Sequence, residues 1–273
     1  MSIPMRQSVR IGAYLAKNKV MRRKMFPLIV ELEPLFACNL ACPGCGKIQF
    51  PTEILRQRVS VEQAVAAMEE CGAPMVSIAG GEPLLHPDID RMVGELVRRK
   101  KFVYLCTNGV LLRRKLDLFK PSPYFSFAIH IDGLRERHDI AVDREGVFDE
   151  AVACIREAMA RGFRVTTNTT FFNTDTPQTV REVLDFLNDD LKVDAMMISP
   201  GTPTRRLPTK STSYQPTRRG RCSPRRSPTA GASVGGSTIH RCSSTSSKAR
   251  STSNAHRGAF PATRCSAGSA RAT

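Results

Sequence analysis

The first 201 residues alternate short apolar runs with longer segments in which apolar residues recur at helical spacing. The short runs have the length and the β-branched content of strands, and the longer segments have the spacing of one buried helix face. Six strands are expected, at LIVELEP (28–34), MVSIAG (75–80), FVYLCT (102–107), YFSFAIHID (124–132), RVTTNTTFF (164–172) and DAMMIS (194–199). Because strands and helices alternate, the pattern predicts a parallel sheet covered by helices.

Helix boundaries are marked by cap residues. Ser60 followed by Gln63 fits a capping box, Gly72 is placed to end the same helix, and Thr176 with Pro177 fits the start of a later one. The inward faces are expected to be Val61, Ala64, Val65 and Met68; Ile89, Met92, Val93, Leu96 and Val97; Val152, Ile155 and Met159, closed by Gly162; and Val180, Val183, Leu184 and Leu187.

The predicted fold class is α/β, as a partial (β/α)6 TIM-like barrel or as an open doubly wound sheet. In both, functional residues gather at the carboxyl ends of the strands. Cys38–Cys45 follows the first strand, Gly80–Pro83 follows the second, Cys106–Gly109 ends the third and His130–Gly133 ends the fourth. We therefore expect these segments to converge on one rim.

Charge divides the 273-residue chain into unequal parts. Residues 1–201 hold 27 Lys and Arg against 25 Asp and Glu, whereas residues 202–273 hold 14 Lys and Arg and no acid. We divide the chain into a basic N-terminal segment (1–27), an α/β core (28–201) and a basic tail rich in Ser, Thr, Arg and Pro (202–273).

The tail has almost no large apolar residues, so its composition predicts an irregular, disordered segment. Codons that encode the tail can be chosen so that a second reading frame encodes a sequence with aromatic and acidic residues. We therefore favour loss of one nucleotide near Gly201, with a genuine basic tail as the alternative. Nucleic-acid binding is not expected, because aromatic residues are not interleaved with the tail's arginines.

No apolar run is long enough to span a membrane, and the N-terminus lacks a signal-peptide pattern. A cytoplasmic protein with reduced thiols is expected, in which nine cysteines indicate metal binding or chemistry. The basic segment 1–27 has scattered apolar residues. It fits peripheral contact with the inner face of an anionic membrane, or an ordinary amphipathic helix that covers the core.

The segment FACNLACPGCGKIQF (36–50) holds Cys38, Cys42 and Cys45 in C-x3-C-x2-C spacing. Three thiolates on one loop can hold three corners of a [4Fe–4S] cube and leave one iron with an open position. Structural zinc sites use four ligands, usually as two pairs, and residues 46–201 offer only single cysteines. An iron–sulfur cluster is therefore favoured over zinc and over unrelated buried thiols.

The cysteine motif after the first strand, together with GGEP (80–83) after the second, resembles the radical S-adenosylmethionine (SAM) enzymes over about residues 25–200. Within that family, FPLIVELEPLFACNLACPGCGKIQFP, SIAGGEPLLHPDI and YLCTNG are similar to members that act in hopanoid biosynthesis. Those members add a 5′-deoxyadenosyl radical to a hopene to form adenosylhopane. One departure is Gly44, where the family often has an aromatic residue, so Phe50 or Ile48 is expected to pack against adenine.

The resemblance implies a transferase of lipid metabolism. Its cofactors would be a [4Fe–4S] cluster on Cys38, Cys42 and Cys45, and SAM. Its partners would be a hopene lipid such as diploptene and a one-electron reductant such as flavodoxin or ferredoxin. The alternatives are another radical SAM reaction, such as hydrogen abstraction from a peptide or small molecule, and a non-catalytic metal-stabilised binding module.

The resemblance also implies a SAM site at the rim, in which GGEP binds the methionyl ammonium and later polar residues reach the ribose or the carboxylate. A plain Gly-Gly turn, a bare Asn-Gly turn and a structural histidine are the alternatives. The expected SAM-binding residues are Gly80, Gly81, Glu82, Pro83, Asn108, His130, Asp132 and Asn168.

Cys106 lies at the rim end of the third predicted strand. If an adenosyl radical adds to an alkene, the product carries a carbon radical that must gain a hydrogen atom, and a thiol S–H bond is weaker than most alkyl C–H bonds. Cys106 is therefore the candidate catalytic hydrogen-atom donor. The alternative is a small buried hydrophobe.

Overall fold

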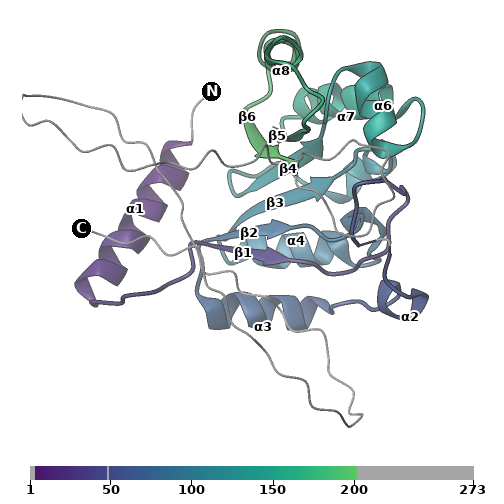
Figure 1. Ribbon diagram of the computed structural model, residues 1–273. Helices are drawn as coiled ribbons and strands as arrows, with labels where there is room; N and C mark the ends of the chain where they lie inside the picture. Colours follow the sequence, from purple (N-terminus) through teal and green to yellow (C-terminus); the bar gives the residue numbers. More distant parts are fainter. Residues whose placement is uncertain (1–3, 48, 202–273) are drawn as a thin grey trace, which may run out of the picture. The chain divides into compact units, whose positions relative to one another are not determined.

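The structure is a computed structural model that describes residues 4–47 and 49–201 (Figure 1). Its six strands form one parallel sheet in the order β1-β2-β3-β4-β5-β6. Because each strand pairs with the next along the chain, the sheet winds in one direction as part of a barrel, whereas a doubly wound sheet reverses its strand order. The strands are β1 (Ile29–Leu32), β2 (Met75–Ile78), β3 (Phe102–Thr107), β4 (Phe125–His130), β5 (Arg164–Phe171) and β6 (Ala195–Pro200).

All six expected strands are present, and the partial TIM-like barrel is the correct one of the two predicted sheets. Four helices coincide with the predicted apolar stripes: α3 (Val61–Cys71), α4 (Ile89–Arg98), α7 (Val147–Ala160) and α8 (Pro177–Asp185). Shorter elements lie between them: α2 (Thr52–Leu55), α5 (Leu112–Lys115), α6 (Arg135–Val142), and the turns η1 (Pro83–Leu85), η2 (Leu116–Leu118) and η3 (Phe186–Asp190).

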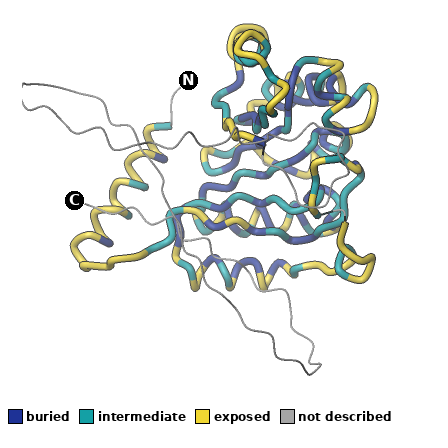
Figure 2. Tube along the Cα trace, viewed as in Figure 1, coloured by how far each residue is buried: buried dark blue, intermediate teal, exposed yellow. Residues whose placement is uncertain are grey.

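The sheet has one face packed against helices and one concave face. In β3, Val103 and Leu105 point to the helices and are fully buried, whereas Tyr104 and Cys106 alternate with them and are half-buried. The strands are in register, so polar positions align across the concave face in one row: Glu31, Ser77, Tyr104, Ser126 and Arg164. The hydrophobic core therefore lies between sheet and helices, and Figure 2 shows those helices buried on one side only.

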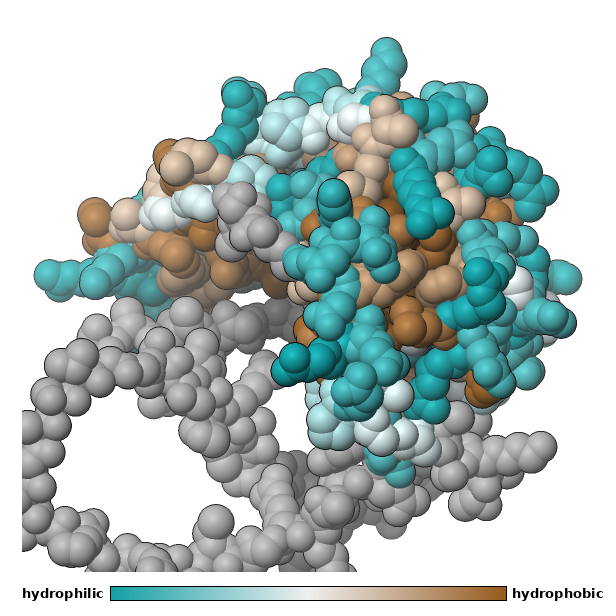
Figure 3. All heavy atoms as spheres, turned by 90° about the horizontal axis from the view of Figure 1, so that it is seen from above, coloured by the Kyte–Doolittle hydropathy of each residue, from teal (hydrophilic) through white to brown (hydrophobic). Residues whose placement is uncertain are grey.

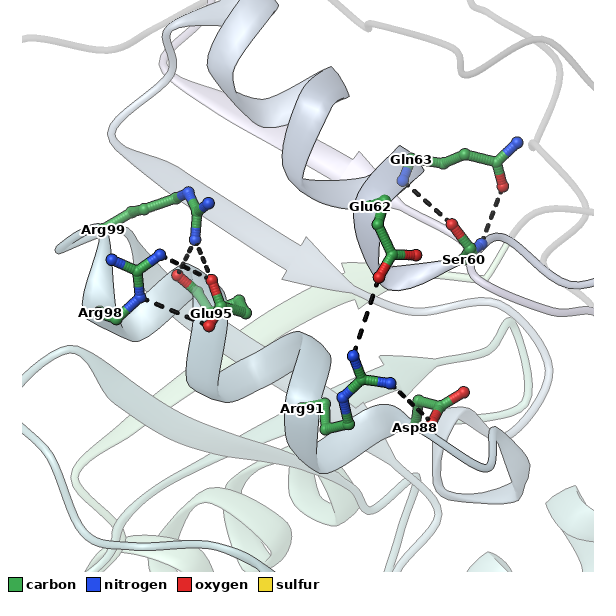
Figure 4. A network of polar contacts seen from close by, with 8 residues as sticks. All are labelled: Ser60, Glu62, Gln63, Asp88, Arg91, Glu95, Arg98 and Arg99. Atoms are coloured by element: carbon green, nitrogen blue, oxygen red, sulfur yellow. Dashed lines mark hydrogen bonds and ion pairs between the residues drawn. The ribbon is translucent and has the colours of Figure 1, made fainter.

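The predicted caps are confirmed. Ser60 Oγ accepts from the Gln63 amide at 3.2 Å, and the Ser60 amide donates to Gln63 Oε1 at 2.9 Å (Figure 4). Gly72 has a φ of 67°, which only glycine adopts without strain. Thr176 caps α8 with Pro177 at its first position, although Leu187, expected in that helix, lies in the π turn η3 instead.

Exposed ion pairs join α3 to α4 and brace the last turn of α4 (Figure 4). Arg91 reaches Glu62 at 3.8 Å, and Arg99 reaches Glu69 at 2.8 Å and also contacts Glu95. Exposed pairs of this kind contribute little to stability, because water screens them. The packing of the apolar stripes, rather than these pairs, fixes the helices on the sheet.

The basic N-terminal segment forms helix α1 (Met5–Val20), which contacts the sheet through polar side chains. Gln7 Nε2 donates to the Tyr104 hydroxyl at 2.8 Å, and the guanidinium of Arg10 lies 5.6 Å from the centre of the Tyr124 ring. Helix α1 therefore packs on the sheet, as one of the two expectations states, but it does so through polar side chains.

Among the described residues, no helix combines the length and the apolar character that a membrane span needs. The tail of residues 202–273, which we expect to be irregular and to come from a shifted reading frame, lies outside the described residues.

Candidate functional site

The cysteine loop lies directly against the GGEP turn. The amide of Gly81 donates to the carbonyl of Leu35 at 3.0 Å, and the amide of Glu82 donates to the carbonyl of Ala37 at 2.8 Å. Ala37 immediately precedes Cys38, so the backbone after β1 and the backbone after β2 are joined at the first cysteine. The predicted convergence of these two segments is therefore present.

Gly80 and Gly81 are required by this close approach. A Cβ on Gly80, whose φ is 119°, would stand 2.3 Å from the carbonyl oxygen of Leu35. A Cβ on Gly81 would stand 2.1 Å from that of Ala37 and 2.4 Å from that of Phe36. Real Cβ contacts are never this short, so the two glycines let the turn and the cysteine loop touch.

Glu82 is completely buried beneath the rim, and its carboxylate is a hydrogen-bond acceptor for three neighbours. Oε1 accepts from the Leu84 amide at 3.0 Å and from the Thr107 hydroxyl at 2.9 Å, and Oε2 accepts from the Asn108 amide at 2.9 Å. Burial raises the pKa of Glu82, while these hydrogen bonds oppose the rise. The side chain of Glu82 therefore supports the turn after β2 and the end of β3.

Asn108 connects the end of β3 to the cysteine loop. Its side-chain Nδ2 donates to Asn39 Oδ1 at 2.8 Å and lies 3.9 Å from Cys38 Sγ. Its Oδ1 accepts from the Val110 amide at 3.1 Å, so the polar atoms of its side chain already have protein partners. Asn108 is thus next to the first cysteine, as its place at the rim predicted, and holds that cysteine's loop.

The three cysteines of the motif are free and half-buried. Burial raises the pKa of Cys42 to about 12, and the neighbouring Cys38 and Cys45 add to the rise. The Cys45 amide donates to the Cys42 carbonyl at 3.0 Å, which turns the backbone between them. A bound metal centre would offset the cost of ionising these buried thiols, because it stabilises the thiolate form.

The donor set fits a cluster better than a single ion. No three His, Cys, Asp or Glu side chains in residues 4–47 and 49–201 converge on one metal ion. In a [4Fe–4S] cluster each thiolate binds a different iron. The three sulfurs therefore need to lie around the cluster, and they do not need to point at one common ion. Cys38, Cys42 and Cys45 would each hold one iron of such a cluster, next to the GGEP turn.

The residues after Cys45 contact the segment that follows β1. Lys47 pairs with Glu33, and its ammonium lies 5.8 Å from the centre of the Phe36 ring. Phe36 stacks on Phe50 with ring centres 5.4 Å apart. Phe50, one of the two residues expected to pack on adenine, is therefore stacked on Phe36, and the other, Ile48, lies outside the described residues.

His130 and Asp132 face one side, as their spacing predicted, but they bind each other. His130 Nε2 lies 2.7 Å from Asp132 Oδ2, and Asp132 Oδ1 accepts from the Thr170 amide at 2.7 Å. Burial lowers the pKa of His130, but the Asp132 carboxylate outweighs it, so the pKa is raised overall. Asn168 lies beside His130 in the next strand and is half-buried on the concave face.

Cys106 lies on the concave face, with its Sγ 3.4 Å from the hydroxyl oxygen of Ser77. Burial raises the pKa of Cys106, so its sulfur retains the proton at neutral pH. Cys106 is paired with Ala128 of β4 across the sheet, and its sulfur reaches Ser77 of β2 on the other side. The thiol therefore sits beneath the rim in its protonated form.

Sequence reasoning did not assign three residues that hold the site together: Asn39, Lys47 and His138. His138 is buried, with Nδ1 accepting from the Asp132 amide at 3.0 Å. Its single occurrence in a helical pattern carries no signal of that contact. Asn39 and Lys47 flank the motif cysteines, and their position in the motif loop was the signal that could have found them.

Comparison with known proteins gives one family. A sequence model of the radical SAM superfamily matches residues 32–187. The GTP 3′,8-cyclase of Chlorobaculum tepidum is 30% identical over 138 residues, which are 48% of this chain and 41% of that protein. The mycofactocin maturase MftC of Mycobacterium tuberculosis is 29% identical over 142 residues, which are 50% of this chain and 36% of that protein.

The solved structures agree on the fold. A crystal structure of Streptococcus suis SuiB bound to S-adenosylmethionine superposes with a TM-score of 0.60 at 20% identity. The alignment covers 77% of this chain and 47% of that one. The chain thus spans less than half the length of each of these three proteins.

Proposed function

Since the chain belongs to the radical SAM superfamily, we propose that it directs a 5′-deoxyadenosyl radical at a substrate over its concave face and ends the reaction with a hydrogen atom from Cys106. The family's cofactors are a [4Fe–4S] cluster and SAM, which together supply that radical when bound. The observation that carries the proposal is the position of the Cys106 thiol on the concave side of β3, 3.4 Å from the Ser77 hydroxyl.

The protein's own residues divide the work. Cys38, Cys42 and Cys45 would hold the cluster, and the Gly80–Pro83 turn, fixed against Ala37, would present backbone to the methionyl end of SAM. Asn168 and His130 border the concave face next to the rim, where a ribose would be within reach of polar groups. Glu82, buried under the turn, keeps these parts in place.

The favoured substrate is a hopene lipid. It is supported by the similarity of the segments around the cysteine motif, GGEP and YLCTNG to radical SAM enzymes that act in hopanoid biosynthesis. The adenosyl radical would form a C–C bond with the alkene and leave the unpaired electron on the adjoining carbon. Cys106 would then lose its S–H bond as a C–H bond forms on the product. One electron from the reductant and one proton from water would return the sulfur to a thiol.

A second reaction is supported by the curated relatives, whose names refer to GTP cyclisation and mycofactocin maturation. In this reaction the adenosyl radical would abstract hydrogen from a peptide or a small molecule and leave as 5′-deoxyadenosine. Cys106 could quench the substrate radical here as well. The two reactions differ in whether the adenosyl group stays on the product.

The test is anaerobic reconstitution of the full chain with iron and sulfide, followed by SAM, reduced flavodoxin and diploptene in D2O. The thiol of Cys106 exchanges its proton with solvent, so the adduct is expected to carry one deuterium. Cys106→Ala should still cleave SAM but give little adduct, or adduct of altered stereochemistry. Cys154→Ala, at a buried thiol on α7 away from the concave face, is the matched control. Unchanged, deuterated adduct from Cys106→Ala would exclude the donor role, and free 5′-deoxyadenosine without adduct would favour hydrogen abstraction.

A further inference from the structure

Helix α1 has polar residues on its packed side and apolar residues outside. Gln7 and Asn18 are 6% and 2% exposed, whereas Met5, Val9 and Val20 are 77%, 63% and 82% exposed. At 3.6 residues per turn, Met5, Val9 and Val20 fall on one stripe opposite Gln7 and Asn18. This is the reverse of a helix that covers a hydrophobic core. At the left of Figure 3, where α1 lies, hydrophobic residues gather beside hydrophilic ones.

Cations border the apolar stripe of α1 on both sides. Arg6, Arg10 and Lys17 lie along one edge and Lys19 along the other. The following turn continues the arrangement, with Met21 and Met25 exposed by 51% and 71%. Between residues 1 and 30 the chain has seven Lys and Arg and no Asp or Glu. The charges around the apolar stripe are therefore positive, and they complement an anionic surface.

A cavity of about 300 Å³ opens beside the same helix and is lined by cations. Arg10 and Lys17 from α1 meet Lys101 from the start of β3, and no acidic residue lines the cavity among the described residues. Burial lowers the pKa of Lys101, and the nearby charge of Arg10 lowers it further. An anionic group in this cavity would offset both the burial and the repulsion.

We propose that α1 is a docking surface for an anionic lipid bilayer, with the Met5–Val9–Val20 stripe at the acyl boundary and a headgroup phosphate in the Arg10–Lys17–Lys101 cavity. An apolar stripe between two rows of cations is the pattern of a helix that lies in the membrane interface. Each Lys or Arg near an anionic surface adds affinity. The surface is distinct from the rim, so the inference stands whatever substrate the radical attacks.

The test is flotation of the full chain with vesicles of phosphatidylglycerol and phosphatidylcholine, compared with vesicles of phosphatidylcholine alone. The chain is expected to bind the anionic vesicles and to lose that binding at high salt. The double variant Val9→Glu, Val20→Glu should lower the partition coefficient about tenfold or more, since it removes apolar contacts and adds repulsion. Lys17→Glu should lower it roughly fivefold or more.

The control is Leu118→Glu, which removes an exposed apolar side chain, 51% exposed, from the turn η2 on another part of the surface. It should bind as the parent chain does, and thermal unfolding should show that all variants are folded. Equal binding by the double variant would overturn the proposal and assign the affinity to the basic tail. Equal binding to both kinds of vesicle, or no vesicle binding together with a dimer that the double variant abolishes, would overturn it too.

Discussion

The Glu82 carboxylate accepts a hydrogen bond of 2.9 Å from the backbone amide of Asn108, 26 residues later in the chain. Asn108 in turn holds Asn39 beside the first motif cysteine. One buried carboxylate thus links the turn after β2, the end of β3 and the cysteine loop. The side chains of Glu82 and Asn108 therefore join the three segments that form the site.

Glu82→Ala should destabilise the fold by about 3 kcal/mol or more, because it leaves two buried donors and one partly buried donor without an acceptor. Urea unfolding measures the change. Glu82→Gln keeps the volume and one acceptor oxygen and should cost clearly less. A Glu82→Ala variant as stable as the parent chain would show that these hydrogen bonds do not hold the rim together.

Gly81→Ala should separate the GGEP turn from the cysteine loop, since its Cβ would meet the Ala37 carbonyl oxygen at 2.1 Å. A loss of several kcal/mol in stability and a loss of iron binding are expected. Gly94→Ala is the matched control, because that glycine lies in α4 with nothing within 4 Å of the added carbon. It should stabilise the chain by up to about 1 kcal/mol. Equal effects of the two substitutions would contradict the close approach.

Asn108→Asp should lower the reduction potential of the reconstituted cluster. It replaces an N–H donor 3.9 Å from Cys38 Sγ with a negative charge. Hydrogen bonds to cluster sulfurs raise the potential, and the loss of about 1 kcal/mol corresponds to roughly 40 mV for a one-electron couple. Spectroelectrochemical titration without SAM gives the value. Asn173→Asp adds the same charge at an exposed position and should leave the potential unchanged.

His138 should make stability depend on pH. Burial, followed by the neighbouring His130, lowers the pKa of His138 from 6.5 to about 4. The unfolded chain therefore binds a proton first as pH falls, so stability is complete above about pH 6.5 and is lost towards pH 4. His138→Asn keeps an acceptor for the Asp132 amide but does not titrate. Between about pH 7.5 and pH 5 the parent chain should lose on the order of 2 kcal/mol more than the variant. Parallel pH profiles in urea unfolding would contradict this.

The fold was largely predictable because its information is local. Strand periodicity, the Ser60 capping box and the positive φ of Gly72 are each set by residues close in sequence. The arrangement of the rim followed from the parallel order of the strands. The partners of Glu82 and His138 were not predictable, because they depend on contacts between distant segments that no spacing rule records.

The outward side of α1 shows the same limit. Its apolar and basic residues were visible in the sequence, but the pattern alone left open whether the apolar side faced the sheet. The buried Gln7 and its bond to Tyr104 decide that question, since they assign the packed side of the helix to polar residues.

The most direct measurement of the central claim is the iron and sulfide content of the anaerobically reconstituted chain, together with its electron paramagnetic resonance spectrum after reduction. The account predicts a [4Fe–4S] cluster whose spectrum changes on addition of SAM, and its loss when Cys38, Cys42 or Cys45 is replaced by alanine. Cys71→Ala, at the end of α3, should retain it. A single bound ion, or a full cluster in the alanine variants of the motif, would contradict the account.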